Sequence, residues 1–219
     1  MIISYDFGHG CGQDRGANGI VNEELTIRAY APFAVASLIR AGHTLVNCTP
    51  TSANTLQESL SYRTEHANAS KSQLHLCFHV NAFQHTDAPM GCEIEVASDN
   101  GAKYGQSVLN EIVKLGFKNR GIKRPDLYVT KNTNMPAILI EPFFCDSIAD
   151  CKLYNASMLG NAIAKGIFDI IGGTTPPVVK SVVKVVYRVV TGSFTSESNA
   201  DAHIAELKAK GFESFKVIV

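Results

Sequence analysis

Short apolar runs alternate with longer stretches of helical spacing from residue 1 to about residue 172, and this alternation restricts the chain to few folds. The apolar or period-two runs predict strands at residues 1–7, 43–49, 73–82, 91–98, 126–132 and 136–144. The helical spacing predicts helices at residues 23–42, 56–70, 102–117 and 150–173. Strands that alternate with helices favour an α/β fold with a mixed, mostly parallel sheet flanked by helices.

A change in composition separates the end of the chain from this pattern. Residues 172–179 read GGTTPPVV, and glycine, threonine and adjacent prolines are typical of an extended linker. We therefore predict a first domain at residues 1–173, a linker at 174–180 and a small βαβ unit at 181–219. The unit is expected to contain strands at 185–194 and 213–219 and, between them, a helix with Ala200, Ile204 and Leu207 on one face. A unit of this size seldom folds alone, so it should either dock on the first domain or pair with a second copy, and we expect pairing in a homodimer.

Charge and hydropathy exclude several classes of function. Lys and Arg number 20 and Asp and Glu also number 20, so no net field attracts a polyphosphate backbone, and nucleic-acid binding is not expected. No uncharged apolar stretch approaches the ~20 residues of a membrane span, and no basic segment precedes the first apolar residues, so neither a membrane span nor an export signal is predicted. The six cysteines form no CxxC pair, which is typical of reduced, buried thiols in a protein made in the cytoplasm.

Several polar residues follow predicted strands or begin predicted helices, where functional groups gather in α/β proteins. His9 lies between two glycines after the first strand, His79 follows the strand LHLCF, and Glu141 follows AILI. Glu23 and Glu24 begin the first long helix. Two histidines and one of these glutamates form a chemically sensible zinc triad that leaves a fourth position for water, and Glu141 would then be free to act as a general base.

Each residue also has a structural interpretation. His9 is compatible with a hydrogen-bonding loop histidine, and His79 with a satisfied core histidine. Glu23 and Glu24 both suit the positive end of a helix dipole. Glu141 is harder to explain in this way, because a carboxylate between AILI and PFF is costly to bury without a partner.

Five ordered segments carry a resemblance to a known family. They are GHG (8–10), NEE (22–24), FHVNA (78–82), GCEIEV (91–96) and PAILIEPFFCD (136–146). Together they resemble the zinc-dependent N-acetylmuramoyl-L-alanine amidases of the amidase-3 family, which includes bacterial autolysins and phage endolysins. YRTEHAN (62–68) is similar to the arginine-containing segment of that family. The resemblance covers roughly residues 1–172.

The resemblance implies a site and a reaction. His9, Glu23 and His79 would be ligands of Zn2+, and Glu141 the catalytic glutamate. Zinc would activate a water and Glu141 would carry its proton to the leaving amine, so that the amide between N-acetylmuramic acid and L-alanine of peptidoglycan is cleaved.

Glu23, Asn81 and Cys11 have different expected roles in this site. Glu23 is chosen over Glu24 because the ligand of the family begins its helix after an approach similar to GIVNE. Asn81 is expected to hold substrate or to support a ligand. The family often has DPGHGG where this chain has DFGHGC, and we interpret Cys11 as a lining residue and not as a ligand.

The last residues have their own resemblance. Residues 187–219 are similar to one half of a SPOR-like domain, a small α/β repeat that binds glycan strands. Since such domains carry two βαβ halves, two chains would each supply one half, which agrees with the expected homodimer.

The sequence is compatible with several biological roles. The leading hypothesis is a phage endolysin that reaches the wall after lysis or through a holin, and a mother-cell autolysin of sporulation is the alternative with the same activity. A zinc peptidase acting on the stem peptide would use the same residues. An inactive wall-binding protein, in which the histidines and carboxylates are structural, is the remaining alternative.

Overall fold

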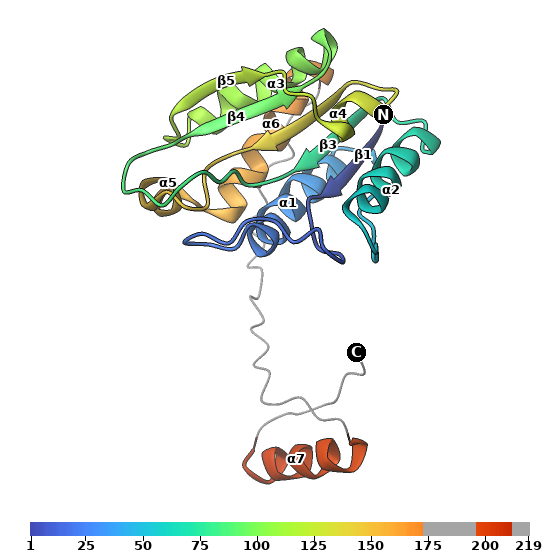
Figure 1. Cartoon of the computed structure of the whole chain (residues 1–219), viewed down its shortest axis with the longest axis vertical. Coiled ribbons are helices and arrows are strands. Elements are labelled where there is room, and N and C mark those ends of the chain that lie inside the picture. Colours follow the sequence, from blue (N-terminus) through green and yellow to red (C-terminus); the bar gives the residue numbers. More distant parts are fainter. Residues whose placement is uncertain (173–195, 212–219) are drawn as a thin grey trace. The chain divides into compact units, whose positions relative to one another are not determined.

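The structure is a computed structural model that describes residues 1–172 and 196–211. The described residues form strands β1 (Ile2–Phe7), β2 (Thr44–Asn47), β3 (Leu74–Phe78), β4 (Cys92–Val96), β5 (Asn119–Lys123) and β6 (Ala137–Glu141). The helices are α1 (Glu23–Arg40), α2 (Leu56–Ala69), α3 (Asp99–Val113), α4 (Tyr128–Asn132), α5 (Ile148–Leu153), α6 (Ala156–Ile171) and α7 (Glu197–Ala209). Figure 1 shows how the elements of residues 1–172 are arranged.

The six strands form one mixed sheet in the order β2-β1-β3-β6-β4-β5. Strands β2, β1, β3 and β6 are mutually parallel, whereas β4 runs antiparallel to β6 and β5 runs parallel to β4. The carboxyl ends of β1, β3 and β6 therefore lie at the same edge of the sheet as the amino ends of β4 and β5. This edge is formed by strand ends and not by an outer strand, and side chains from five strands can meet there.

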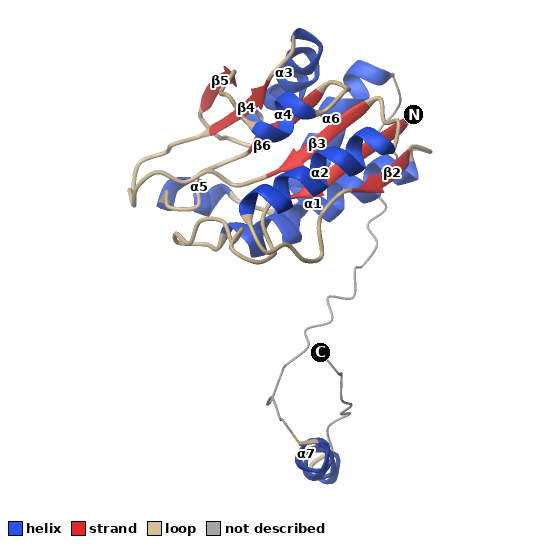
Figure 2. Cartoon of the chain, turned by 45° about the vertical axis from the view of Figure 1, so that its right-hand side comes forward, coloured by secondary structure: helices blue, strands red, loops and turns tan. Residues whose placement is uncertain are grey.

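Helices cover both faces of the sheet. Helices α1, α3 and α6 lie on one face, and α2 and α4 on the other (Figure 2). The main core is apolar, with Ile27, Tyr30 and Leu38 of α1 fully buried beside residues of the central strands. Strand β3 is buried at every position, because helices cover it on both sides.

Side-chain caps fix where the helices begin. The side chains of Asn22, Thr55 and Ser98 accept hydrogen bonds from backbone amides of the first turns of α1, α2 and α3. Helix α1 ends before Gly42, which has φ of 85°, as the sequence predicts. The predicted α/β fold with a mixed, mostly parallel sheet is confirmed.

One predicted strand is wrong. Residues 126–132 were expected to be extended, but Tyr128–Asn132 form the short helix α4, whose Val129 packs on Cys77 and Leu139. The strand of this region is instead Asn119–Lys123, a polar segment at the sheet edge. An edge strand of this kind buries few side chains, so it lacks the apolar pattern from which strands are predicted.

One predicted helix is two helices. The segment 150–173 was expected to be continuous, but Tyr154 adopts an extended conformation with ψ of 126° and separates α5 from α6. The Asn155 side chain then accepts a hydrogen bond from the amide of Met158 and begins α6. The sequence does not indicate this break, because apolar residues recur at helical spacing on both sides of it. The cap at Asn155 changes the direction of the backbone without interrupting that hydrophobic pattern.

The chain divides into two compact units, residues 1–179 and 180–219. In the second unit, helix α7 is described, and Ala200, Ile204 and Leu207 are its half-buried apolar residues. The expected linker at 174–180 and the expected strands at 185–194 and 213–219 lie outside the described residues.

Two expectations about composition can be compared with the described residues. All six cysteines are free, and all but Cys151 are buried. Among the described helices, none has the length and apolar character needed to cross a membrane.

Candidate active site

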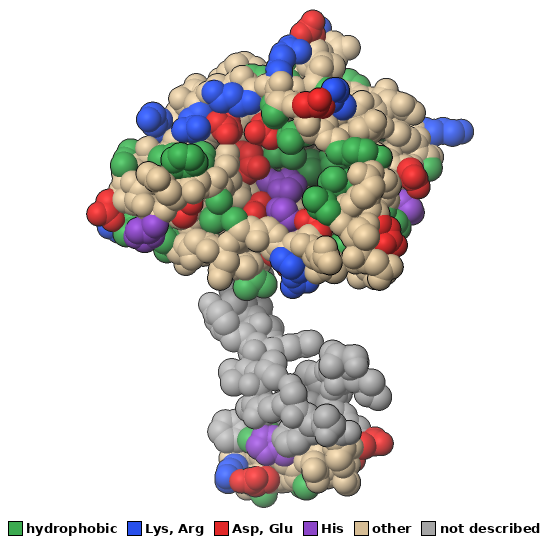
Figure 3. Space-filling view, in the orientation of Figure 1, with side chains coloured by type: hydrophobic (Ala, Val, Ile, Leu, Met, Phe, Trp, Pro, Cys, Tyr) green, Lys and Arg blue, Asp and Glu red, His purple; other side chains and the backbone are tan. Residues whose placement is uncertain are grey.

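The sheet topology brings together the polar residues that follow three strands. His9 lies after β1, His79 follows β3, and Glu141 is the last residue of β6. Because β1, β3 and β6 are parallel, all three side chains lie at one edge of the sheet. Figure 3 shows His side chains in the middle of one face of the first unit, with Asp and Glu side chains beside them.

His9, Glu23 and His79 form a compact cluster. One nitrogen or oxygen of each lies within 4.8 Å of the others, an arrangement that can hold a metal ion. Oε1 of Glu23 is 3.0 Å from Nε2 of His9 and 3.1 Å from Nδ1 of His79. The two imidazole rings meet edge to face, with their centres 4.7 Å apart.

The positions of Glu23 and Glu24 differ clearly. Glu23 is the first residue of α1 and is 4% exposed, and its carboxylate also accepts hydrogen bonds from the amides of Ala17 and Val80. Although burial opposes its charged form, the two histidines hold the pKa of Glu23 well below its usual range. Glu24 points elsewhere and pairs with Arg15 at 3.2 Å. Only Glu23 of this pair joins the cluster.

His9 sits in a turn with an unusual backbone. Its φ is 61°, a left-handed conformation that few non-glycine residues adopt, and Gly10 follows with φ of 104°. Two arginines hold the turn: Arg28 donates to the carbonyls of Gly8 and His9, and Arg63 donates to the carbonyls of Phe7 and His9. This conformation is therefore fixed by contacts from two helices.

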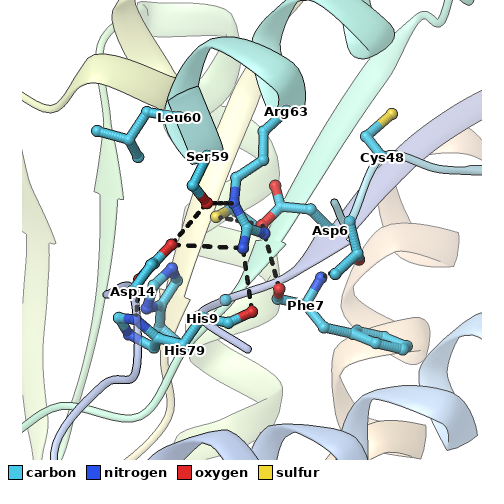
Figure 4. A network of polar contacts seen from close by, with 12 residues as sticks. Asp6, Phe7, His9, Asp14, Cys48, Ser59, Leu60, Arg63 and His79 are labelled. Carbon is cyan, nitrogen blue, oxygen red and sulfur yellow. Dashed lines mark hydrogen bonds and ion pairs between the residues drawn. The ribbon is translucent and has the colours of Figure 1, made fainter. Parts of the chain in front are cut away.

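Asp14 orients the ring of His9. Its Oδ1 lies 2.5 Å from Nδ1 of His9, and its Oδ2 accepts a hydrogen bond from Ser59 (Figure 4). Asp14 and Glu23 together raise the pKa of His9 to about 9, although burial acts in the opposite direction. Since Nδ1 is engaged by Asp14, Nε2 is the ring nitrogen that faces the cluster.

Beneath the turn lies a buried ion pair. Arg63 is 2% exposed and Asp6 is fully buried, and their Nη1 and Oδ1 atoms are 2.5 Å apart. His75 Nε2 contacts the other Asp6 oxygen at 2.9 Å. Burial disfavours a charged Asp6, but Arg63 and His75 overcome this effect and lower its pKa. Figure 4 shows how Arg63 links Asp6, Asp14 and the backbone of the His9 turn.

His79 is placed by close packing. A Cβ atom on Gly8 would lie 2.5 Å from Cε1 of His79, so only glycine lets the turn approach this ring. Tyr30 of α1, fully buried, donates to the carbonyl of His79 at 2.8 Å. Both contacts fix His79 relative to α1 and the His9 turn.

Glu141 has an enclosed and incompletely satisfied carboxyl group. Its Oε2 atom is buried and has no hydrogen-bond partner among the described residues. Burial raises the pKa of Glu141 well above its usual range, and the negative charges of Glu23, Glu95 and Glu93 act in the same direction. Such a group is ready to bind a proton or a hydrogen-bond donor brought by a ligand.

Asn81 lies outside the cluster and supports its surroundings. Its Nδ2 donates to Oε1 of Glu93 at 2.7 Å. Glu93 is directly opposite Glu141 in the antiparallel pair of β4 and β6. The other Glu93 oxygen accepts from Nε of Arg120 at 2.7 Å.

Cys11 is buried and donates weakly to Ser59, so it lies beside the turn and not in the cluster.

A cavity of about 310 Å³ opens beside these residues. Ala17, whose amide binds Glu23, and Ala82, which follows Asn81, line it together with Asp146 and His85. The cavity provides room for part of a ligand next to the cluster.

Sequence reasoning missed Asp14, Arg28, Arg63, Glu93 and Arg120. Arg63 and Glu93 were noted only within family-like segments, although the helix of Arg63 offers a signal. The buried face of α2 is Ser59, Arg63, Thr64 and Ala67, and a helix that buries so many polar residues must meet polar partners. Asp14 has no comparable signal, because it lies in a loop without periodicity.

An α/β domain with two imidazoles, a carboxylate and a further enclosed carboxyl group at the carboxyl ends of its strands has the fold and the site of a hydrolase. A family model described as N-acetylmuramoyl-L-alanine amidase matches residues 3–172. The chain belongs to this family of peptidoglycan amidases. A model of the SPOR domain matches residues 159–217.

Individual proteins agree with this result. The sporulation-specific N-acetylmuramoyl-L-alanine amidase of Bacillus subtilis is 28% identical over 99% of this chain and 84% of its own length. The N-acetylmuramoyl-L-alanine amidase CwlM of Bacillus licheniformis is 30% identical over 98% of this chain and 84% of its own length. Among solved structures, the catalytic domain of the CD27L endolysin targeting Clostridia difficile superposes with a TM-score of 0.70 at 26% identity, covering 77% of this chain and 97% of that domain.

Proposed function

We propose that this chain is a zinc-dependent amidase that cleaves the bond between N-acetylmuramic acid and L-alanine of peptidoglycan. The observation that carries the proposal is the cluster of His9, Glu23 and His79 beside Glu141, at the edge where β1, β3 and β6 end. In this proposal Nε2 of His9, the Glu23 carboxylate and Nδ1 of His79 hold the ion.

The donor set suits zinc. Two imidazole nitrogens and a carboxylate oxygen are ligands that Zn2+ takes in hydrolytic sites, and three protein ligands leave a position open. Asp14 on Nδ1 of His9 supplies the outer hydrogen bond that metal-binding histidines commonly make. The carboxylates of Glu23, Glu93, Glu95 and Glu141 share this edge, so a cation there would also relieve their mutual repulsion.

A bound zinc ion would supply Lewis acidity, lowering the pKa of a water and polarising the scissile carbonyl. Glu141 acts as the general base that accepts a proton at Oε2, the oxygen without a hydrogen-bond partner in the described part of the chain, and then passes it to the leaving nitrogen. Asn81 holds Glu93 in place opposite Glu141 and thereby maintains the polar wall of the site.

Metal content and activity test the two halves of this proposal separately. Purified protein should contain about one zinc per chain, and His79→Ala should abolish both zinc and hydrolysis. Glu141→Gln should keep the zinc while hydrolysis falls by about 10²–10⁴-fold, since only the proton carrier is removed. A Glu141→Gln enzyme with normal turnover would refute the catalytic assignment.

Product analysis separates the amidase from its rivals. Mass spectrometry of digested wall should find free muramoyl ends and new amino-terminal alanine. New termini inside the stem peptide would indicate a peptidase instead. Zinc-loaded protein that binds wall but releases neither product would indicate a binding protein without activity.

The biological setting is a further proposal. A role in phage-type lysis is supported by the similarity to the CD27L endolysin domain, and a role in sporulation by the sporulation-specific relative that aligns with 99% of the chain. For the first role, we propose that the enzyme reaches the wall through a membrane pore or after lysis. Expression in a Gram-positive host should then cause lysis only when a pore-forming protein is co-expressed.

The second unit is proposed to bind glycan strands and to pair two chains. The SPOR match and the apolar face of α7, formed by Ala200, Ile204 and Leu207, support this role. Full-length protein should sediment as a dimer at micromolar concentration, and a chain ending at residue 173 should sediment as a monomer. A monomeric full-length protein would refute the pairing.

A further inference from the structure

Arg120 occupies a place in the sheet where the backbone is irregular. Cys92 pairs with Asn119, but Ile94 pairs with Ile122, so β5 has one more residue than β4 in this interval. Arg120 and Gly121 are the residues of β5 within this bulge, and Gly121 has φ of 86°. Bulges redirect side chains and are frequent beside active sites. The amino end of β5 also lies at the edge that carries the candidate site.

The guanidinium of Arg120 is held on two sides. Its Nε donates to Oε2 of Glu93 at 2.7 Å, and its Cζ lies 4.8 Å from the centre of the Phe144 ring. Glu93 is in turn fixed by Asn81, two residues beyond His79. Buried polar and aromatic contacts therefore set the orientation of this cation before any ligand arrives.

The outer end of the same group remains available. The Arg120 side chain is 31% exposed, and the described residues give its two Nη groups no hydrogen bond or ion pair. Two parallel N–H donors at the end of a planar group match the two oxygens of a carboxylate. Arg120 thus offers an oriented carboxylate-binding fork.

The Arg120 fork lies near Glu141, the proposed general base. Arg120 contacts Glu93, and Glu93 lies directly opposite Glu141, where Cβ atoms of facing residues are about 5 Å apart. Strand β5 lies one strand beyond β4, so Arg120 is about two strand spacings, roughly 10 Å, from Glu141. About three residues of extended peptide span this distance.

We infer that Arg120 binds a carboxylate of the stem peptide, on the alanine side of the bond that is cut. The inference rests on the proposed function, because peptidoglycan supplies this ligand. Its glycan is uncharged once the lactyl carboxyl is in amide linkage, whereas carboxylates occur along the stem peptide. The β5 side of the site is then the peptide side, and the stem peptide runs from Glu141 towards β5.

Kinetics of the zinc-loaded, full-length enzyme on soluble muropeptides test this inference. The substrates carry glutamate or isoglutamine at the second position of the stem, and diaminopimelate or lysine at the third. Arg120→Gln should raise KM for carboxylate-bearing substrates by roughly 10- to 100-fold, as for loss of a charge-assisted hydrogen bond, with kcat changed less than about twofold. Substrates that differ at one position identify which carboxylate is bound. Wild type should prefer the substrate that carries this carboxylate, and Arg120→Gln should lose the preference.

Matched variants separate local binding from other effects. Lys123→Gln removes one exposed positive charge from the same strand and should leave KM within about twofold. Arg120→Lys keeps the charge but loses the fork, and it should give an intermediate KM. If Arg120→Gln lowers kcat equally on all four substrates without a change in KM, the arginine only supports Glu93 and the inference is wrong.

A binding experiment keeps the test independent of catalysis. Calorimetry with the free peptide L-alanyl-γ-D-glutamyl-L-lysine should show binding to wild type and loss of about 10-fold or more in affinity for Arg120→Gln. Binding that depends on Arg120 in a protein without amidase activity would support the inference and refute the proposed function. Normal amidase activity together with peptide binding that is unaffected by Arg120→Gln would support the proposed function and refute the inference.

Discussion

Arg63 of helix α2 donates from Nη2 to the carbonyl oxygen of His9 at 3.1 Å. The two residues are 54 positions apart, and the bond joins a buried cation to the turn that presents a candidate metal ligand. The same guanidinium pairs with Asp6, so stability of the domain and geometry of the site depend on one side chain.

Replacement of Arg63 should therefore be severe. Arg63→Met leaves Asp6 as a buried charge without its main partner, and we expect the free energy of unfolding to fall by about 3–5 kcal/mol. Urea denaturation measures this change. Arg40→Met removes an exposed arginine whose Nη2 donates to Ser37 at 2.7 Å, and it should change the free energy by about 1 kcal/mol or less. Similar losses for the two variants would contradict the assigned role of the buried pair.

Asp14 should control metal affinity more than stability. Asp14→Asn weakens the contact at Nδ1 of His9, and loss of such an outer hydrogen bond commonly reduces metal affinity by about 10- to 100-fold. Competition with a fluorescent chelator gives the zinc affinity directly. Asp87→Asn changes an exposed acid in a loop and should bind zinc as wild type does. An unchanged zinc affinity for Asp14→Asn would show that Asp14 does not orient His9.

Gly16 and Gly42 form a matched pair of left-handed glycines. Their φ angles are 70° and 85°, so alanine at either position costs about 1 kcal/mol or more in backbone strain. A Cβ atom at Gly16 would also lie 2.7 Å from Cδ2 of His9 and 2.9 Å from Oε2 of Glu23. A Cβ atom at Gly42 would meet no other atom of the described residues within 4 Å, apart from its chain neighbours. Gly16→Ala should lose about 10-fold or more in zinc affinity, and Gly42→Ala should lose stability alone. Equal zinc affinities would show that the close approach is unimportant.

Acid should weaken the domain partly through Asp6. Its folded pKa lies below the unfolded value of about 3.9, because Arg63 and His75 outweigh the effect of burial. A carboxyl group shifted in this direction stabilises the fold above its unfolded pKa and loses that contribution as pH falls towards the folded value.

Asp6→Asn tests this pH dependence. The variant should be less stable than wild type at pH 6, and the difference should shrink below about pH 4. Urea denaturation at several pH values measures it. A difference that stays constant down to pH 2 would mean that the charge on Asp6 does not contribute.

The sequence predicted most elements; it missed β5 and α4, and it joined α5 and α6 into one helix, for identifiable reasons. Apolar runs such as LHLCF indicate a strand because every residue of β3 is buried, and apolar spacing with a final glycine indicates α1. Strand β5 and helix α4 were misassigned because β5 is polar and lies at the edge, while α4 is short and buries only Val129 and Thr130. The hydrophobic periodicity of a segment indicates which of its residues are buried. Both segments bury few residues, so neither has a clear periodicity.

The sequence by itself determined the α/β alternation, the family and the four residues His9, Glu23, His79 and Glu141 as candidates. It favoured Glu23 over Glu24 only by resemblance, whereas in the folded chain Glu23 faces both histidines and Glu24 pairs with Arg15. Tertiary structure alone decided that Asp14 contacts His9, that Arg63 holds the turn and that Arg120 reaches Glu93. The physical reason is that hydrophobic periodicity indicates only which face of a single helix or strand packs on the core. These contacts depend instead on the order of the strands, and on bulges and turns that bring distant loops to one edge of the sheet.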